Sequence, residues 1–204
     1  MIIGLTGGIA SGKSTAAATL GSWGAHVIDA DKLGHRAYLQ NTPAFDAVVS
    51  TFGEDTVGED GEIDRRVLGG KVFGRPEKLK ALTDIVWPAI RALAQAQIDT
   101  VAAQQPERVI VLEAAVLLEA QWQDLVDEIW VTIVDRAVAI ARASARDGVD
   151  AEAIEARIDA QLDNEERRRA ADHVIDNSGS EEDLIAQLEV LWSHRDAQQR
   201  DANE

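Results

Sequence analysis

A glycine-rich segment near the start of the chain has the residue types that bind phosphate. Gly7 to Ser14 read Gly-Gly-Ile-Ala-Ser-Gly-Lys-Ser, which fits the pattern of Gly, four residues, then Gly-Lys-Ser/Thr. In that pattern backbone N–H groups surround a phosphate chain, and the following helix adds the positive end of its dipole. Lys13 would reach the β- and γ-phosphates as a point charge, and the Ser14 hydroxyl would complete the shell of a Mg²⁺ ion. The segment predicts a nucleoside triphosphate site.

The phosphate loop alone leaves the reaction open, because GTPases, motor ATPases and small-molecule kinases all use it. The chain has no Asn-Lys-x-Asp segment, with which GTPases usually read guanine. Motor ATPases are usually larger and take further arginines from neighbouring subunits. A chain of 204 residues with arginines grouped on helices near its end favours a kinase that closes a lid over ATP.

The second apolar segment of the chain, Ala25 to Asp29, ends in a carboxylate, and a second carboxylate follows at Asp31. The carboxyl ends of strands are where an open parallel sheet binds its ligands. Phosphoryl transfer to a hydroxyl needs a group that orients the nucleophile and accepts its proton, and a carboxylate does both. Asp is also favoured as a helix N-cap, so spacing alone leaves each residue open between a cap and a catalytic base.

Arginines are grouped in the last third of an otherwise acidic chain. Arg142 and Arg146 are four residues apart, so one helical face presents both guanidinium groups. Arg157 and Gln161 repeat this spacing on the next helical segment. We interpret Arg142 and Arg146 as stabilising charge on a transferring phosphoryl group. For Arg167 to Arg169 we favour pairing with nearby acids, which are as frequent there as the arginines.

Short apolar runs alternate with helical patterns along the chain. Runs at 1–5, 25–29, 109–112, 129–134 and 173–176 predict buried strands, and the patterns at 13–22, 135–147, 151–170 and 180–194 predict helices. Residues 43–103 read as mostly helical, with Pro88 breaking or kinking a longer helix. This alternation predicts an α/β fold with a parallel sheet covered on both faces.

The composition limits the classes of partner. The chain has 20 Lys+Arg against 36 Asp+Glu, a net charge of −16 and no Cys. Such a surface repels nucleic acid and anionic lipid, so we expect neither as a partner, and a thiol nucleophile or a disulfide is excluded. The N-terminus lacks the features of a signal peptide, and no apolar run spans a bilayer, so we expect a cytoplasmic protein.

Several motifs in order along the chain resemble the dephospho-CoA kinase family. Leu5 to Thr15 with Val27-Ile-Asp-Ala-Asp31 resemble the family's opening, and Asp60-Gly-Glu-Ile-Asp-Arg65 resembles its Asp-Gly-x-Ile-Asp-Arg segment. Leu117-Leu-Glu119 resembles its Leu-Leu-x-Glu turn. Arg142 to Gly148 and Ala156 to Gln161 resemble its lid, and Ala171 to Gly179 its last strand and turn.

The resemblance implies an α/β fold of the P-loop NTPase type, with a parallel five-stranded sheet and helices on both faces. It implies a single kinase domain over 1–204, with a core at 1–32, 106–135 and 171–195, an acceptor-binding helical insertion at about 33–105 and a lid at about 136–170. The implied reaction moves the γ-phosphoryl of ATP, with Mg²⁺, to the ribose 3′-hydroxyl of dephospho-CoA. ATP and dephospho-CoA are the implied partners of a monomer or weak homo-oligomer.

The resemblance also implies residue roles. Asp31 would orient and deprotonate the 3′-hydroxyl, Lys13 would bridge the β- and γ-phosphates, and Arg142 would stabilise the transferred charge. Arg65, Leu117 and Glu119 would contact the acceptor together with Asp31. The residues implied to bind ATP, of which Ser14 would also meet the metal, are Gly8, Ala10, Ser11, Gly12, Lys13, Ser14, Thr15, Arg146, Arg157 and Asn177.

The sequence departs from the family pattern at several positions. Ala10 replaces a usual glycine of the loop, which we expect to be tolerable if its φ is negative. Trp87-Pro88 stands where bacterial members commonly have His-Pro, Glu113-Ala-Ala replaces a common Asp-x-Pro, and Ala139 replaces a frequent Gln. Two alternatives remain: another small-molecule or nucleoside monophosphate kinase of the same fold, and a regulator that binds nucleotide without transferring phosphate.

Overall fold

The computed structural model describes residues 1–201, and the side chains of residues 1–195. The described chain divides into two compact units. The first unit comprises residues 1–28 and the chain from Gln105 onward, and the second comprises Asp29–Gln104. No helix within the described residues is long and apolar enough to cross a bilayer.

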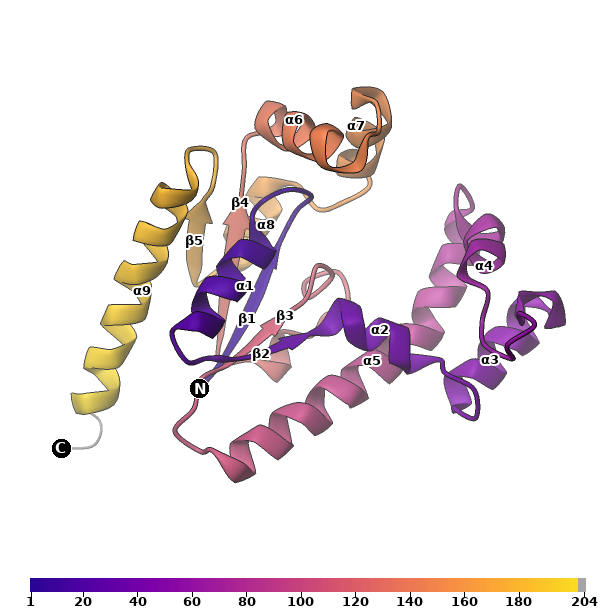
Figure 1. Cartoon of the computed structure of the whole chain (residues 1–204), viewed down its shortest axis with the longest axis horizontal. Helices are drawn as coiled ribbons and strands as arrows, with labels where there is room; N and C mark the ends of the chain where they lie inside the picture. The colour runs from indigo at the N-terminus through magenta and orange to yellow at the C-terminus, as the bar shows by residue number, and fades with distance from the viewer. Residues whose placement is uncertain (202–204) are drawn as a thin grey trace. The chain divides into compact units, whose positions relative to one another are not determined.

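A five-stranded parallel sheet organises the first unit, as the sequence predicts (Figure 1). The strand order is β2-β3-β1-β4-β5, with β1 in the centre. Residues of β1, β3 and β4 are buried on both faces, which explains why these segments are mainly apolar instead of alternating between apolar and polar residues. The strands are β1 (Ile2–Gly7), β2 (His26–Asp29), β3 (Ile110–Glu113), β4 (Glu128–Ile133) and β5 (His173–Asp176).

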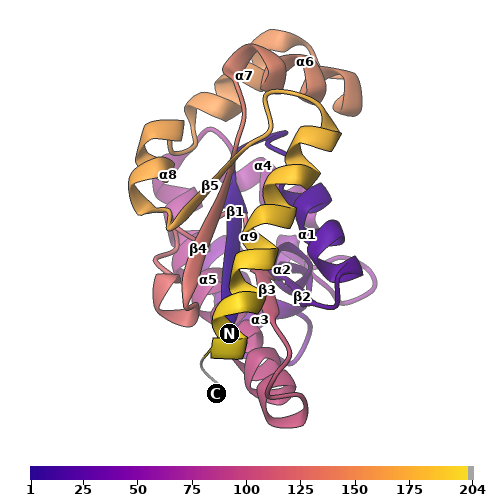
Figure 2. The ribbon, with the colours of Figure 1, turned by 90° about the vertical axis from the view of Figure 1, so that its left-hand side faces the viewer.

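Helices cover both faces of this sheet (Figure 2). Helices α1 (Lys13–Ser22) and α9 (Glu181–Asp201) lie side by side on one face. There Leu20 of α1 and Leu188 of α9 pack with Ile3, Leu5 and Trp130 of the strands. Helix α8 (Asn164–Ala170) lies against β4 on the other side of the strands. The short helix η2 (Gln123–Leu125) precedes β4, and α6 (Arg136–Asp147) and α7 (Ala151–Asp159) follow it.

Two helix boundaries in this unit differ from the sequence prediction. The predicted helix at 151–170 is two helices, α7 and α8, because Asp163 starts a new helix with a capping box. In that box the Asp163 side chain accepts from Glu166 N at 2.7 Å, and Glu166 accepts from Asp163 N at 3.0 Å. The last helix extends to Asp201, seven residues beyond the predicted end at residue 194. The prediction stopped early because it followed the apolar pattern, which ends before the helix does.

The second unit is helical. Its helices are α2 (Ala30–Ala37), α3 (Pro43–Phe52), η1 (Glu54–Thr56), α4 (Arg65–Val72) and α5 (Pro76–Gln104), and α5 packs against α2, α3 and α4. Pro88 lies inside α5, which continues through it, so of the two outcomes expected, a break or a kink, the break does not occur. A proline inside a helix costs about 3 kcal/mol. Buried residues at helical spacing, including Val86, Ile90, Ala94 and Ile98, offset that cost by packing one face of α5.

Candidate active site

The loop between β1 and α1 has backbone conformations that restrict its residue types. Gly12, the N-cap of α1, has φ +87°, a value that favours glycine. A Cβ at Gly12 would also collide with the side-chain amide of Asn177. The Asn177 Nδ2 donates to Ser11 O at 3.1 Å, so the turn after β5 supports the loop directly. The structure thus brings Asn177 against the loop.

Ala10 adopts φ +55°, so the condition under which alanine was expected to be tolerable, a negative φ, is not met. The left-handed conformation costs a non-glycine residue about 1–2 kcal/mol, because Cβ approaches the following carbonyl oxygen. Contacts on either side fix the loop around this residue. Ser11 N donates to Gly8 O at 3.2 Å, and the buried hydroxyls of Ser11 and Thr132 are 2.7 Å apart.

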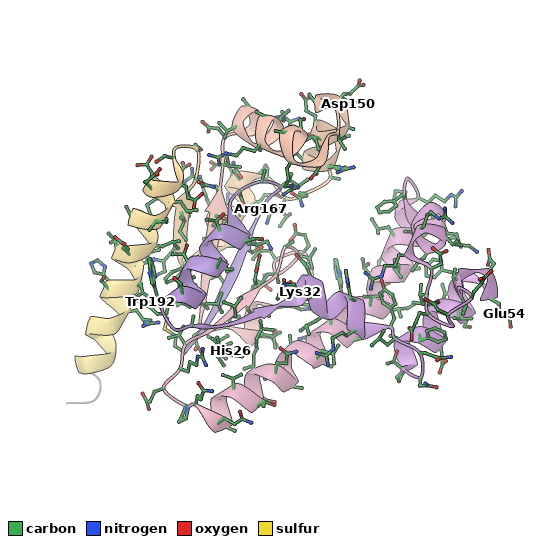
Figure 3. The ribbon with its side chains drawn as sticks, viewed as in Figure 1. His26, Lys32, Glu54, Asp150, Arg167 and Trp192 are labelled. Carbon is green, nitrogen blue, oxygen red and sulfur yellow. The ribbon has the colours of Figure 1, made fainter. Side chains whose placement is uncertain are left out.

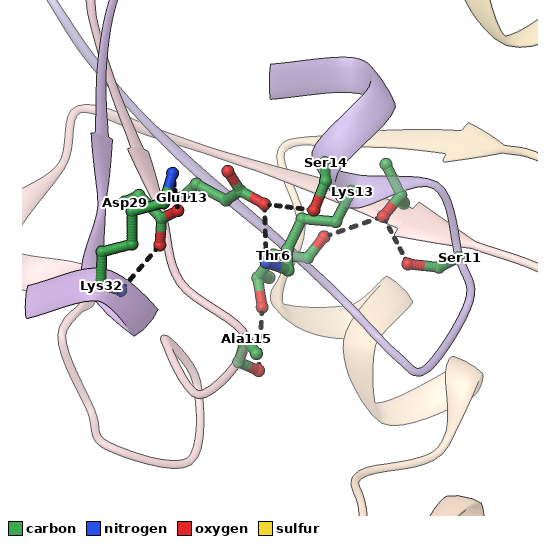
Figure 4. A network of polar contacts seen from close by, with 9 residues as sticks. Thr6, Ser11, Lys13, Ser14, Asp29, Lys32, Glu113 and Ala115 are labelled. Carbon is green, nitrogen blue, oxygen red and sulfur yellow. Dashed lines mark hydrogen bonds and ion pairs between the residues drawn. The ribbon is translucent and has the colours of Figure 1, made fainter. Parts of the chain in front are cut away.

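Glu113 is bonded to both functional side chains of the loop (Figure 4). Its Oε1 accepts from Lys13 Nζ and from Ser14 Oγ, each at 2.8 Å. The Lys13 and Glu113 side chains are only 11% and 8% exposed, so this ion pair is largely shielded from water. The parallel register pairs Glu113 with Leu5, two residues before the end of β1, which brings the carboxylate to the loop. Sequence reasoning noted Glu113 only as a departure. The signal that could have found it is a carboxylate at the carboxyl end of a buried strand.

Arg142 bonds to backbone carbonyls of the turn after β5. Its NH1 donates to Asn177 O at 2.6 Å and its NH2 donates to Gly179 O at 2.7 Å. The structure therefore brings together Arg142 and Asn177, two of the residues predicted from sequence. In this state the guanidinium connects α6 to the turn that also supports the phosphate loop.

Arg146 is paired with its neighbour Asp147. The Arg146 guanidinium donates to both carboxylate oxygens, at 2.7 and 3.1 Å, and Arg157 NH1 lies 3.6 Å from Asp147 Oδ2. The hydrogen bond from Arg146 is the main reason why the pKa of Asp147 is lowered. In this structure Arg146 is therefore engaged by a neighbouring carboxylate.

Arg167 is fully buried and pairs with Glu119. Its NH2 donates to Glu119 Oε1 at 3.0 Å, and its Nε donates to Leu162 O at 3.2 Å. Pairing with acids was the favoured interpretation of this arginine. Figure 3 marks Arg167 beside the loop that joins β1 to α1.

Leu117, expected to contact the acceptor, is a core residue. Its side chain is fully buried, and its Cδ1 lies 2.7 Å from where a Cβ on Gly4 would stand. A side chain that fills the space above a glycine of β1 is not available to a ligand. We therefore withdraw Leu117 as a side-chain contact of the acceptor. The apolar Leu-Leu pattern reports packing here.

The structure of the second unit distinguishes between the two aspartates whose roles the sequence left open. Asp29 is the N-cap of α2: its Oδ1 accepts from Lys32 N at 3.0 Å, and its Oδ2 lies 3.1 Å from Lys32 Nζ. Asp31 stands in the first turn of the same helix and is exposed. Since Asp29 fills the cap position, capping does not explain the carboxylate of Asp31.

A cavity of about 280 Å³ in the second unit contains Arg65. The guanidinium carbon of Arg65 lies 5.6 Å from the centre of the Tyr38 ring, and its NH2 donates to His35 O at 3.4 Å. Trp87 and Ile90 of α5 line the same cavity. This combination of aromatic rings and one guanidinium suits a ligand that has both apolar and anionic parts.

Comparison with known proteins places the chain in a family. The family model for dephospho-CoA kinase matches residues 1–183. The dephospho-CoA kinase of Symbiobacterium thermophilum is 45% identical over 191 residues, which are 94% of this chain and 80% of that protein. The dephospho-CoA kinase of Geobacter sulfurreducens is 43% identical, with 95% of this chain and 98% of that protein covered.

Solved structures agree with this placement. A protein from Thermus thermophilus matches with a TM-score of 0.78 and 34% identity, covering 95% of this chain and 97% of that one. The dephospho-CoA kinase from Campylobacter jejuni matches with a TM-score of 0.63 and 27% identity, covering 95% and 96%. A shikimate kinase from Bacteroides thetaiotaomicron, with a TM-score of 0.50 and 16% identity, shares the fold. The resemblance seen in the motifs is confirmed, and the chain belongs to the dephospho-CoA kinase family.

Proposed function

We propose that this chain transfers the γ-phosphoryl of ATP to the ribose 3′-hydroxyl of dephospho-CoA, which gives CoA and ADP. The observation that carries the proposal is the cluster in which Lys13 and Ser14, opening α1, share one buried carboxylate oxygen of Glu113. A cation and a hydroxyl at the N-terminus of a helix suit a phosphate chain. The family to which the chain belongs supports dephospho-CoA as the acceptor.

The phosphate loop would hold the donor. Backbone N–H groups from Gly8 to Thr15 would surround the phosphates, and Lys13 would exchange the Glu113 carboxylate for the β- and γ-phosphate oxygens. Both partners are anionic, so the ammonium keeps a counter-charge in either state. Arg146, Arg157 and Asn177 remain candidates for the nucleoside side of the ATP site.

The residues at the loop also fit Mg²⁺. Ser14 supplies a hydroxyl oxygen and Glu113 a carboxylate oxygen, the ligand types that Mg²⁺ prefers. Mg²⁺ usually keeps several waters and is held by one or two protein groups together with substrate phosphates, so few protein ligands are needed. When bound, Mg²⁺ supplies neutralisation of charge on the phosphates. We propose that Ser14 contacts it and that Glu113 orients Ser14.

Three side chains would act on the acceptor and on the transferred group. Asp31 would accept the proton of the 3′-hydroxyl. At the same time the 3′-oxygen of the acceptor would bond to the γ-phosphorus of ATP, and the bond between the γ-phosphorus and the bridging oxygen would break to release ADP. Arg142 would leave its carbonyl partners to meet the charge of the transferring group. Arg65 and the cavity around it would bind the acceptor, with Glu119 as a further candidate. In this proposal the helical unit binds the acceptor, and residues 136–170 form the lid.

A coupled assay of ADP release tests the proposal. We expect release with dephospho-CoA and none with AMP, shikimate or gluconate as acceptor. Turnover with one of those acceptors would support another kinase of the same fold. ATP binding without turnover on any acceptor would support a nucleotide-binding regulator.

The cellular setting follows from the same proposal. A kinase that uses ATP is expected where ATP is abundant, so we propose a cytoplasmic enzyme. We also propose a monomer or weak homo-oligomer. Size-exclusion chromatography at several protein concentrations tests the second point.

A further inference from the structure

Gln161 contacts the phosphate loop from the turn between α7 and α8. Ile9 N donates to Gln161 Oε1 at 3.1 Å, across 152 residues of sequence. Because a backbone N–H is a donor, the side-chain atom that faces it must be the amide oxygen. The orientation of the amide is therefore fixed, and its Nε2 points away from Ile9 N. Within the described part of the chain, this NH2 group has no protein acceptor.

The space beside Gln161 is a cavity of about 390 Å³ that opens on the loop. Gly8, Ile9, Ser11 and Gln161 line it, together with residues of α6, α7 and α8. Gly8 has no side chain, and a Cβ there would lie 3.5 Å from Gln161 Oε1. The loop and the amide thus face a common space, in which an anion bound by the loop would meet the NH2 group.

The acids around this cavity are engaged by other groups. Asp159 accepts from Arg136 NH1 at 2.6 Å, and this hydrogen bond is the main reason why its pKa is lowered. Asp163 and Glu166 form the capping box of α8. Their negative charge is thereby directed to an arginine and to backbone N–H groups, which reduces its repulsion of a phosphate.

Arg167 holds the turn that carries Gln161. Its Nε donates to the carbonyl of Leu162, the residue after Gln161, and its NH2 donates to Glu119. The NH1 of Arg167 and the Oε2 of Glu119 are buried without a hydrogen-bond partner. A buried, half-satisfied ion pair adds little stability compared with apolar residues of the same volume. Its presence behind the loop is better explained by fixing the position of the Gln161 turn.

We propose that Gln161 is a further catalytic residue, whose Oε1 is held by Ile9 N while its Nε2 donates to an oxygen of the transferring γ-phosphoryl group. The proposal rests on the proposed kinase function. Charge accumulates on the phosphoryl oxygens during transfer, and a preorganised donor lowers the barrier. Arg167 is a positioning residue that acts through Gln161.

The test compares Gln161→Glu with Gln161→Leu. Glu keeps an oxygen that accepts from Ile9 N but replaces the NH2 donor with negative charge. Leu removes both the acceptor oxygen and the NH2 donor. If Gln161 only supports the loop, the Gln161→Glu variant retains activity and the Gln161→Leu variant loses it. If its NH2 group contacts the phosphoryl group, Leu lowers kcat by about 10²–10³-fold, the usual cost of one such donor, and Glu lowers it further.

The measurements are kcat and KM for ATP with dephospho-CoA, direct binding of ATP, and the melting temperature. We expect both variants to melt near the wild type and to lose more in kcat than in ATP affinity. Gln123→Glu, an exposed substitution on η2 with the same change of charge, is the control and should match the wild type. Gln161→Glu with activity equal to or above that of Gln161→Leu would overturn the proposal. A wild-type protein without turnover on dephospho-CoA would instead refute the proposed function.

Discussion

The pair formed by Lys13 and Glu113 makes a quantitative prediction about stability. Glu113→Ala removes the carboxylate and leaves the Lys13 ammonium in a site where the two side chains are 11% and 8% exposed. Breaking a buried ion pair by removing one partner costs about 3–5 kcal/mol, because the remaining charge stays desolvated. Lys13 has a further interaction, so we expect the lower end, about 3 kcal/mol.

That cost is large enough to measure by thermal unfolding. For a domain of this size each kcal/mol shifts the Tm by about 2–4 °C, so Glu113→Ala should lower the Tm by roughly 6–12 °C. Glu113→Gln keeps an oxygen that accepts from Lys13 and Ser14, and we expect a smaller loss. The loss should also depend on ligand, because bound ATP gives Lys13 new anionic partners.

The assay is differential scanning calorimetry of the wild type, Glu113→Ala and Glu113→Gln, with and without saturating Mg·ATP. We expect the difference in Tm between the wild type and Glu113→Ala to narrow when ATP is present. An unchanged Tm in the absence of nucleotide, or a difference that stays the same in its presence, would refute this account of Glu113.

Three further variants and one matched control test the roles proposed for the site. Lys13→Ala should lower kcat by at least about 10²-fold, because one preorganised charge on the phosphates is lost; near-wild-type kcat would contradict the phosphate-loop assignment. Arg142→Ala should lower kcat more than it raises KM for dephospho-CoA, if the guanidinium meets charge mainly in the transition state; an equal loss of ATP affinity would make Arg142 a ground-state anchor. Asp31→Asn should keep its Tm and lose roughly 10²–10⁴-fold in kcat, whereas Asp29→Ala, the matched cap variant, should cost about 1 kcal/mol of stability with a smaller kinetic effect. The reverse pattern in the two aspartate variants would place the base at Asp29.

The fold was accessible from sequence because its signals are local. The strand at 110–113 begins with a continuous apolar run, Ile110 to Leu112, and the helix at 13–22 follows a glycine-rich turn, so hydrophobic pattern and turn residues specify both. The boundary between α7 and α8 was missed because a capping aspartate inside a polar, charged stretch resembles an ordinary helix position. Whether Pro88 would break the helix could not be decided from sequence, because its cost is local while the packing that outweighs it depends on the other helices of its unit.

The site was less accessible because its contacts join residues far apart in sequence. Glu113 meets Ser14 across 99 residues, and only the parallel register of β1 and β3 brings them together. The positive φ of Ala10 depends on the closure of the loop, since alanine itself favours a negative φ. The burial of the Leu117 side chain was not foreseen, because a motif identifies a residue type without showing whether the side chain packs in the core or binds a ligand.

The identity of the product is the most direct test of the central claim. Incubation with Mg·ATP and dephospho-CoA, followed by ³¹P NMR and mass spectrometry, should show one new phosphomonoester on the ribose 3′-oxygen and an equal amount of ADP. CoA, whose 3′-hydroxyl is already phosphorylated, should support no turnover under the same conditions. A phosphoryl group on another atom of the acceptor, or ADP formed equally with CoA, would contradict the proposed reaction.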